Sequence, residues 1–261
     1  MAKLQDLFAQ ARRTQSGSGM GFLGKNRAEA KPHSAALVVA FSQVTAGSSE
    51  AMLKAGADGL LFSWDGANSA SLEALKKEVD SVKSGNEQIV CGVHITGNWE
   101  RLNNDSFTKI KDQGIQYVVL PFDSPAPLLA IEEKDLEKVV TIPMRKDDMY
   151  PIFIRNLTAF EHIVGVELDF GLTSEVGSMT IEDILHYRAV REAVRFPALL
   201  KVNSDITEAE AYTINTLGVQ AVILDADEDQ DKTREQVKHL RQLLEKVYQE
   251  DKERDLPSLR R

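Results

Sequence analysis

The segment Ala55-Gly56-Ala57-Asp58-Gly59-Leu60-Leu61-Phe62 joins a glycine to a continuous apolar run, and the chain repeats this combination twice. The second copy is Gln113-Gly114-Ile115-Gln116-Tyr117-Val118-Val119-Leu120, and the third is Leu217-Gly218-Val219-Gln220-Ala221-Val222-Ile223-Leu224. In each copy the glycine follows an amphipathic stretch, which is where a helix often ends on a left-handed residue. The apolar run then predicts a parallel strand that is covered on both faces. We therefore interpret the three segments as junctions between a helix and the next strand of a βαβ unit.

The same pattern predicts eight strands along the chain. They lie near residues 35–42, 58–64, 87–95, 115–122, 137–144, 162–169, 197–203 and 219–225. Helical stretches are expected at 72–83, 107–112, 147–160, 181–195, 208–217 and 234–251, whereas the connections 48–54 and 124–133 look short on helix. Eight such units fit a single (β/α)8 barrel, or TIM barrel, which takes about 250 residues. The near-regular spacing favours this closed α/β barrel over a doubly wound open sheet.

We expect the barrel over residues 31–261, after an N-terminal helix and a flexible tether over residues 1–30. Leu4, Leu7, Phe8 and Ala11 form one apolar face of a helix over residues 4–13. This extra helix is expected to cover the bottom of the barrel or to form an interface with another chain. The tether segment 19–24 matches G-x-G-x-x-G, but it follows a helix and precedes an extended stretch. Dinucleotide binding needs the opposite context, so we reject it for this segment.

The composition excludes several classes of protein. Hydrophobic residues make up 43% and charged residues 27% of the chain, which is ordinary for a globular protein and excludes collagen and low-complexity disorder. No apolar run approaches the length that crosses a bilayer, and no secretory signal opens the chain, so we expect a cytoplasmic protein without a membrane partner. A single cysteine, Cys91, excludes an internal disulfide and a cysteine-based zinc site. The net charge of −9 argues against a nucleic-acid partner, while a homo-oligomer stays open.

Candidate site residues follow from the barrel geometry, because active sites lie at the carboxyl ends of the strands and alternate residues point inward. A lysine within an apolar strand costs desolvation free energy unless it is paired or used. We therefore predict that Lys201, Glu167 and Asp169 are catalytic. The same rule predicts the substrate-binding residues His94, Asp123, Arg145, Asn203 and Asp225, and it also turns Ser63 and Thr141 inward. A structural ion pair at Lys201 and a buried inner-layer His94 are the alternatives without catalysis.

The segment from Lys201 to Glu210 resembles the seventh-strand segment of aldolase-type and phosphate-binding TIM barrels. The junction from Leu217 to Ile223 is similar to theirs as well. Two departures concern the phosphate site of those proteins, where backbone N–H groups approach the ligand at glycines. Ser204-Asp205 replaces the glycines of the turn, and the eighth strand ends in Asp225-Ala226-Asp227. Because acids repel phosphate, we predict that the standard phosphate site is lost or altered.

The main functional hypothesis is an aldolase-like lyase or an isomerase that acts on a small carbonyl or carboxylate metabolite. Lys201, activated by burial, would be a Schiff-base amine or a general base, and Glu167 or Asp169 would move protons. Arg145 and Asn203 would hold a substrate oxygen, and no cofactor is required. One alternative is an enzyme that uses a divalent metal held by carboxylates and His94, although no close ligand pair occurs at a strand end. The other is a barrel without catalysis that serves as a binding or assembly module.

Overall fold

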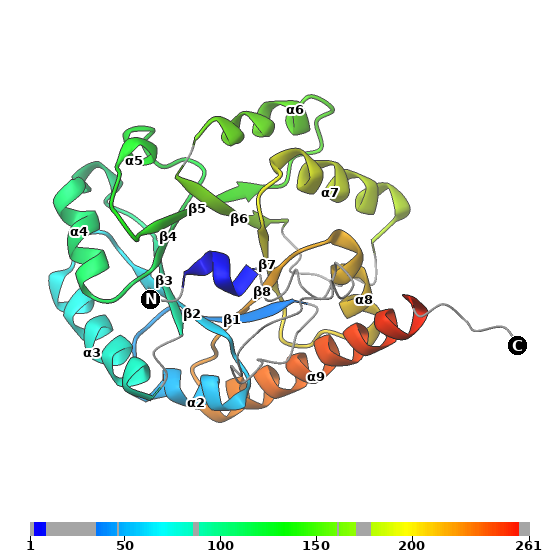
Figure 1. The fold of residues 1–261 in the computed structure, drawn as a ribbon, viewed down its shortest axis with the longest axis horizontal. Coiled ribbons are helices and arrows are strands. Elements are labelled where there is room, and N and C mark those ends of the chain that lie inside the picture. Colours follow the sequence, from blue (N-terminus) through cyan, green and yellow to red (C-terminus); the bar gives the residue numbers. More distant parts are fainter. Residues whose placement is uncertain are drawn as a thin grey trace, which may run out of the picture.

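The computed structural model describes residues 3–8, 35–45, 47–85, 89–160, 162–170 and 179–255. Eight parallel strands close into a barrel in the order of the sequence, which confirms the predicted (β/α)8 fold (Figure 1). The strands are β1 (Ala36–Phe41), β2 (Gly59–Trp64), β3 (Val90–Ile95), β4 (Tyr117–Leu120), β5 (Glu137–Pro143), β6 (Ile163–Asp169), β7 (Ala198–Val202) and β8 (Ala221–Asp225). β8 pairs with β1, so the described sheet has no open edge.

Helices surround the barrel. They are α2 (Ser48–Ala55), α3 (Ser69–Gly85), α4 (Asn104–Asp112), α5 (Pro127–Ala130), α6 (Tyr150–Ile154), α7 (Ile181–Val194), α8 (Glu208–Leu217) and α9 (Gln230–Asp255). Two 3-10 turns, η1 (Trp99–Arg101) and η2 (Arg155–Ala159), lie between the strands as well. None of the described helices combines the length and the apolar character that a bilayer crossing demands.

Two sequence expectations about helices were wrong. The segment 48–54 looked short on helix, but it forms most of α2, which buries Met52 and Ala55 against the barrel. The stretch 147–160 was expected to be one helix, but it divides into α6 and η2. The Asn156 side chain donates to the Phe153 carbonyl and the Thr158 hydroxyl donates to the Arg155 carbonyl. These short-range bonds compete with the α-helical ladder and favour the tighter turns of η2.

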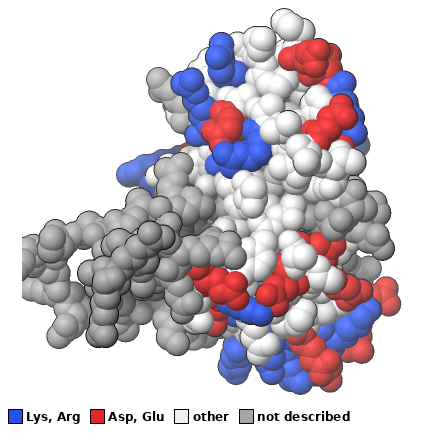
Figure 2. All heavy atoms as spheres, turned by 90° about the vertical axis from the view of Figure 1, so that its right-hand side faces the viewer, with Lys and Arg blue, Asp and Glu red and all other residues white. Residues whose placement is uncertain are grey.

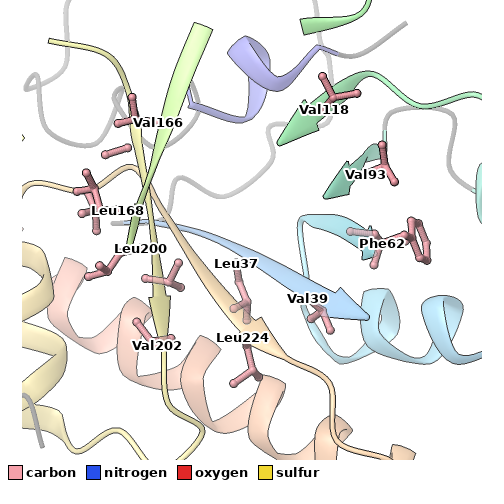
Figure 3. Packing of buried hydrophobic residues seen from close by; sticks show 14 of the residues in the cluster. Leu37, Val39, Phe62, Val93, Val118, Val166, Leu168, Leu200, Val202 and Leu224 are labelled. Atoms are coloured by element: carbon pink, nitrogen blue, oxygen red, sulfur yellow. The ribbon is translucent and has the colours of Figure 1, made fainter. Parts of the chain in front are cut away.

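The alternation along the strands separates two cores. One side of each strand faces the helices, and Figure 3 shows part of this outer core, including Leu37, Val166, Leu200 and Leu224. The other side faces the barrel interior, where Val38, Leu61, Val119, Val139, Leu199 and Ile223 form the inner core. Ala198, Leu200 and Val202 belong to the outer core, so the neighbouring residues of β7 point inward as expected.

The N-terminal residues 4–8 form a helix that closes the bottom of the barrel, and it lies at the centre of the ring of strands in Figure 1. Leu4, Leu7 and Phe8 are buried with the inner core, and the Leu4 backbone N–H donates to Glu137 Oε2 at 2.8 Å. A Cβ atom at Gly165 would lie 3.1 Å from the Phe8 ring, so glycine makes room for this contact. The expected cover is therefore present. Residues 9–13 of the predicted helix, the tether and the segment 19–24 lie outside the described residues.

Candidate functional site

A cavity of about 370 Å³ opens at the carboxyl ends of the strands. Its polar lining comes from different strands: Ser63 on β2, His94 on β3, Glu167 on β6, Lys201 on β7 and Asp225 on β8. The inward alternation that the sequence predicted therefore brings Lys201, Glu167, His94 and Asp225 to one place. Ser63, which the same rule turned inward, joins them.

Lys201 and Asp225 form an ion pair across neighbouring strands, with 2.7 Å between Nζ and Oδ2. Lys201 lies beside Ile223 in the register of β7 and β8, so Asp225 follows at the next inward position. We expected the lysine to be activated by burial, and this expectation was wrong. Its side chain is 53% exposed, because β7 reaches the open mouth of the barrel at this residue. Lys201 is a cation held in place by a carboxylate.

Glu167 is the buried acid of the cavity, with only 6% of its surface exposed. Burial raises the pKa of its carboxyl to about 7, although nearby Lys201 and a hydrogen bond from Thr141 act in the opposite direction. The Thr141 hydroxyl donates to Glu167 Oε2 at 3.4 Å, a long bond. Near neutral pH both the acid and the carboxylate are populated, as a group that moves protons requires.

His94 is half-buried beside Ser63, its register partner on β2. Burial lowers the pKa of its imidazole, and the nearby positive charge of Lys201 lowers it further. The ring is therefore mainly neutral at physiological pH. A neutral imidazole offers one N–H donor and one acceptor, so His94 is suited to hold a polar substrate atom.

The other four predicted residues do not line this cavity. Asp169 ends β6 and is exposed, and Asn203 follows β7 and is exposed as well. Asp123 is exposed in the turn after β4. The Arg145 guanidinium lies 5.8 Å from the Phe122 ring centre and 5.5 Å from that of Tyr150, in contacts between a cation and aromatic faces.

Sequence reasoning missed the contribution of β1. Ala40, which lies on β1, and Ser42, which follows the end of β1, both line the cavity. The alternation rule would have found them, because Ala36 and Val38 of β1 already face the inner core. Both side chains are small, so they carry little chemical signal but leave space beside Asp225.

The helix N-termini after β7 and β8 are capped by the chain itself. At α8, Thr207 and Glu210 form a reciprocal capping box. At α9, the Asp229 carboxylate accepts the N–H groups of Asp231 at 2.9 Å and Lys232 at 3.3 Å. A phosphate at a helix N-terminus needs such N–H groups to be available. Both caps support the expectation that the standard phosphate site is lost or altered.

A second cavity of about 400 Å³ lies next to the first, between the loops after β1 and β8. Phe41, Ser42 and Ala226 line both cavities, so the two are neighbours across a shared wall. Gln43 and Gln230 add carboxamides to the second one.

Among the residues that the structure describes, no group of three or more His, Cys, Asp or Glu side chains is arranged so that it could hold a metal ion.

Comparisons with known proteins identify the fold. No protein-family model matches the chain, and no curated protein matches it. Tryptophan synthase from Mycobacterium tuberculosis matches with a TM-score of 0.61 and 14% identity, covering 94% of this chain and 99% of that chain. Phosphoribosyl anthranilate isomerase from Thermotoga maritima matches with a TM-score of 0.58 and 14% identity, covering 78% and 98%. HpcH/HpaI aldolase from Desulfitobacterium hafniense matches with a TM-score of 0.50 and 11% identity, covering 87% and 96%. The chain is therefore a TIM barrel, with no closer family identified.

Proposed function

We propose that the protein is a lyase or isomerase that moves a proton next to the carbonyl group of a small metabolite. One observation carries this proposal: Glu167, a buried carboxyl with a pKa of about 7, faces the same cavity as the cation of Lys201. A proton carrier and a fixed positive charge are the two groups that enolisation needs.

In the proposed reaction, the Glu167 carboxylate removes a proton from the carbon beside the substrate carbonyl. The electron pair of the broken C–H bond forms a carbon–carbon double bond, and the π pair of the carbonyl group moves onto its oxygen, so that an enolate is formed. Lys201, held by Asp225, stabilises this developing negative charge. If the deprotonated carbon carries a hydroxyl group, transfer of the hydroxyl proton to the enolate oxygen and return of the proton from Glu167 to the former carbonyl carbon moves the carbonyl group, which is isomerisation. If the enolate carbon instead attacks the carbonyl carbon of a second molecule, a carbon–carbon bond forms, the π pair of that carbonyl group moves onto its oxygen, and Glu167 protonates this oxygen. This second path is aldol addition, and its reverse is the lyase step.

The substrate is proposed to lack phosphate, because side chains of the protein already occupy the N-termini of the two helices. Thr207 and Glu210 cap α8, and Asp229 caps α9. The neighbouring cavity would take the remainder of the molecule. The names of two solved structures with this fold, an isomerase and an aldolase, agree with the proposed kind of reaction. Since shared fold does not establish shared activity, the proposal rests on the cavity.

The test is exchange of carbon-bound protons for deuterium in D2O. The exchange is measured as the loss of the signal of the carbon-bound proton in NMR spectra. The probes are pyruvate, 2-oxobutyrate, hydroxypyruvate and dihydroxyacetone. We expect the native chain to exchange at least one of them, at a rate that rises with pH through about 7 as Glu167 ionises. Glu167→Gln should reduce this rate by about 100-fold or more, the usual contribution of a general base.

Two further variants complete the test. Lys201→Met should lower the exchange rate by about 100-fold, the usual loss when a fixed group that stabilises an oxyanion is removed. Glu73→Gln makes the same chemical change at an exposed site on α3 and should leave the rate unchanged. Exchange that survives Glu167→Gln, or a native chain that exchanges none of the four probes, would contradict the proposal.

A further inference from the structure

Among the described residues, the exposed large apolar side chains lie in one part of the fold. Six large apolar residues are between 42% and 82% exposed, and all of them belong to or flank α6, η2 and the first turns of α7. They are Met149, Ile152, Phe153, Phe160, Ile181 and Leu185, here called the apolar patch. Scattered exposed apolar residues need no explanation, but a concentrated set marks a contact surface.

The patch residues come from helices that pack together. α6 and η2 both pack against α7. Ile181 and Leu185 are four residues apart on α7 and therefore share one face. On the other side, Tyr150 and Ile154 of α6 are buried, so the residues between them, Ile152 and Phe153, are turned outward.

Two contacts hold the surface in place. The Lys146 ammonium group, just before α6, lies 2.8 Å from the carboxylate of Asp183 in the first turn of α7. The rings of Tyr150 and Phe153 stack with 6.4 Å between their centres. The patch is therefore preformed, which lowers the entropy cost of covering it.

The size of the patch fits half of a protein interface. With roughly 200 Å² for each large apolar side chain, the six residues expose on the order of 700 Å². This is above the range of about 300–600 Å² that is usual for the largest patch of a monomer. It approaches the roughly 800 Å² that each partner buries in a standard interface.

Charges of both signs surround the patch. Arg145, Lys146 and Arg155 lie near it together with Asp147, Asp148 and Glu182, all of them exposed. Figure 2 faces the side of the barrel that lies to the right in Figure 1, and it shows positive and negative side chains interspersed on this side. A partner whose charges all have one sign, such as an anionic membrane or a nucleic acid, would be repelled by half of these groups.

We propose that a second copy of this chain covers the apolar patch in a twofold-symmetric dimer. In such a dimer the same patch serves both partners, and a rim that carries both signs can pair with its own rotated copy. The apolar area, the preformed helices and the balanced rim charges all meet the needs of this occupant. This proposal is independent of the reaction at the barrel mouth.

The test measures the mass of the full-length chain by sedimentation and by light scattering over micromolar concentrations. We expect twice the chain mass of 29.0 kDa. Phe153→Glu and Ile181→Glu each place a charge in the patch of both copies and should weaken the dimer by about 100-fold or more. Because both residues are exposed in the single chain, circular dichroism should show unchanged folding.

Ala74→Glu adds the same charge at an exposed position of α3 and should leave the dimer intact. A native chain that stays monomeric overturns the proposal. A dimer that survives both patch variants also overturns it, since its interface must then lie elsewhere, for example at the N-terminal helix. Masses that grow beyond the dimer indicate a contact that does not close and overturn the twofold arrangement.

Discussion

Replacing Glu167 by glutamine should stabilise the protein at alkaline pH. The glutamine side chain has the shape of the protonated acid but cannot ionise. In the native protein the Glu167 carboxylate is buried, and burial raises its pKa from the ordinary value of 4.5 to about 7. The folded state therefore prefers the protonated form, and ionisation at higher pH costs stability.

The magnitude follows from the two pKa values. Each pKa unit by which the folded and the unfolded state differ corresponds to about 1.4 kcal/mol in the free energy of unfolding. A rise in the pKa of Glu167 from 4.5 to about 7 therefore corresponds to about 3 kcal/mol. Below pH 4.5 the carboxyl is protonated in both states and there is no penalty. Between pH 4.5 and 7 the folded state binds more protons than the unfolded state, so stability falls as pH rises. Above pH 7 the full penalty applies.

The assay is urea unfolding of the native chain and Glu167→Gln from pH 4 to pH 9. The difference in the free energy of unfolding should change by about 3 kcal/mol in favour of the variant across this range. Glu73→Gln, on the exposed side of α3, serves as the matched control and should show no such change. Proteins commonly sacrifice stability at functional groups, so a stabilising substitution here would agree with a role in the reaction.

Two results would refute this reasoning. A difference between native chain and variant that does not depend on pH would mean that Glu167 titrates alike in the folded and unfolded states. A difference in the free energy of unfolding of the opposite sign, in which the variant becomes less stable than the native chain as pH rises, would mean that Lys201 stabilises the carboxylate by more than burial destabilises it. Carboxyl titration of Glu167 followed by NMR distinguishes the two cases.

Three further predictions concern stability, each measured by urea unfolding. Phe8→Ala removes the ring that closes the bottom of the barrel and should cost about 3–5 kcal/mol; a loss below about 1 kcal/mol would show that the helix over residues 4–8 contributes little. Gly92→Ala places a Cβ atom 2.1 Å from the buried ring of Tyr117 and should cost about 3 kcal/mol, at the upper end for overpacking; a neutral effect would mean that this ring has room to move. Asp229→Ala removes the cap of α9 and should cost about 1 kcal/mol, and no loss would show that water replaces the carboxylate.

The local pattern of the sequence was sufficient for the fold. Glycine followed by a continuous apolar run recurs at helix ends, because a left-handed residue ends a helix cheaply only as glycine and a parallel strand is covered on both faces. Gly56 and Gly218 do adopt the left-handed conformation. The period of two along a strand then determined which residues point inward, and this placed Glu167 and Lys201 in one cavity with His94. Both features depend only on neighbours along the chain.

Distances across the barrel were decided only by the tertiary structure. Lys201 pairs with Asp225 because β7 and β8 adopt one particular register. The spacing of residues along the chain does not specify this register. Glu167 is buried and Lys201 exposed although both face inward, since depth in the barrel depends on the stagger of all eight strands. The pKa of Glu167 follows from that depth. The period of two along each strand therefore placed four of the predicted residues, His94, Glu167, Lys201 and Asp225, in one cavity. The closed sheet decided how deeply each of them is buried, and burial is what raises the pKa of Glu167.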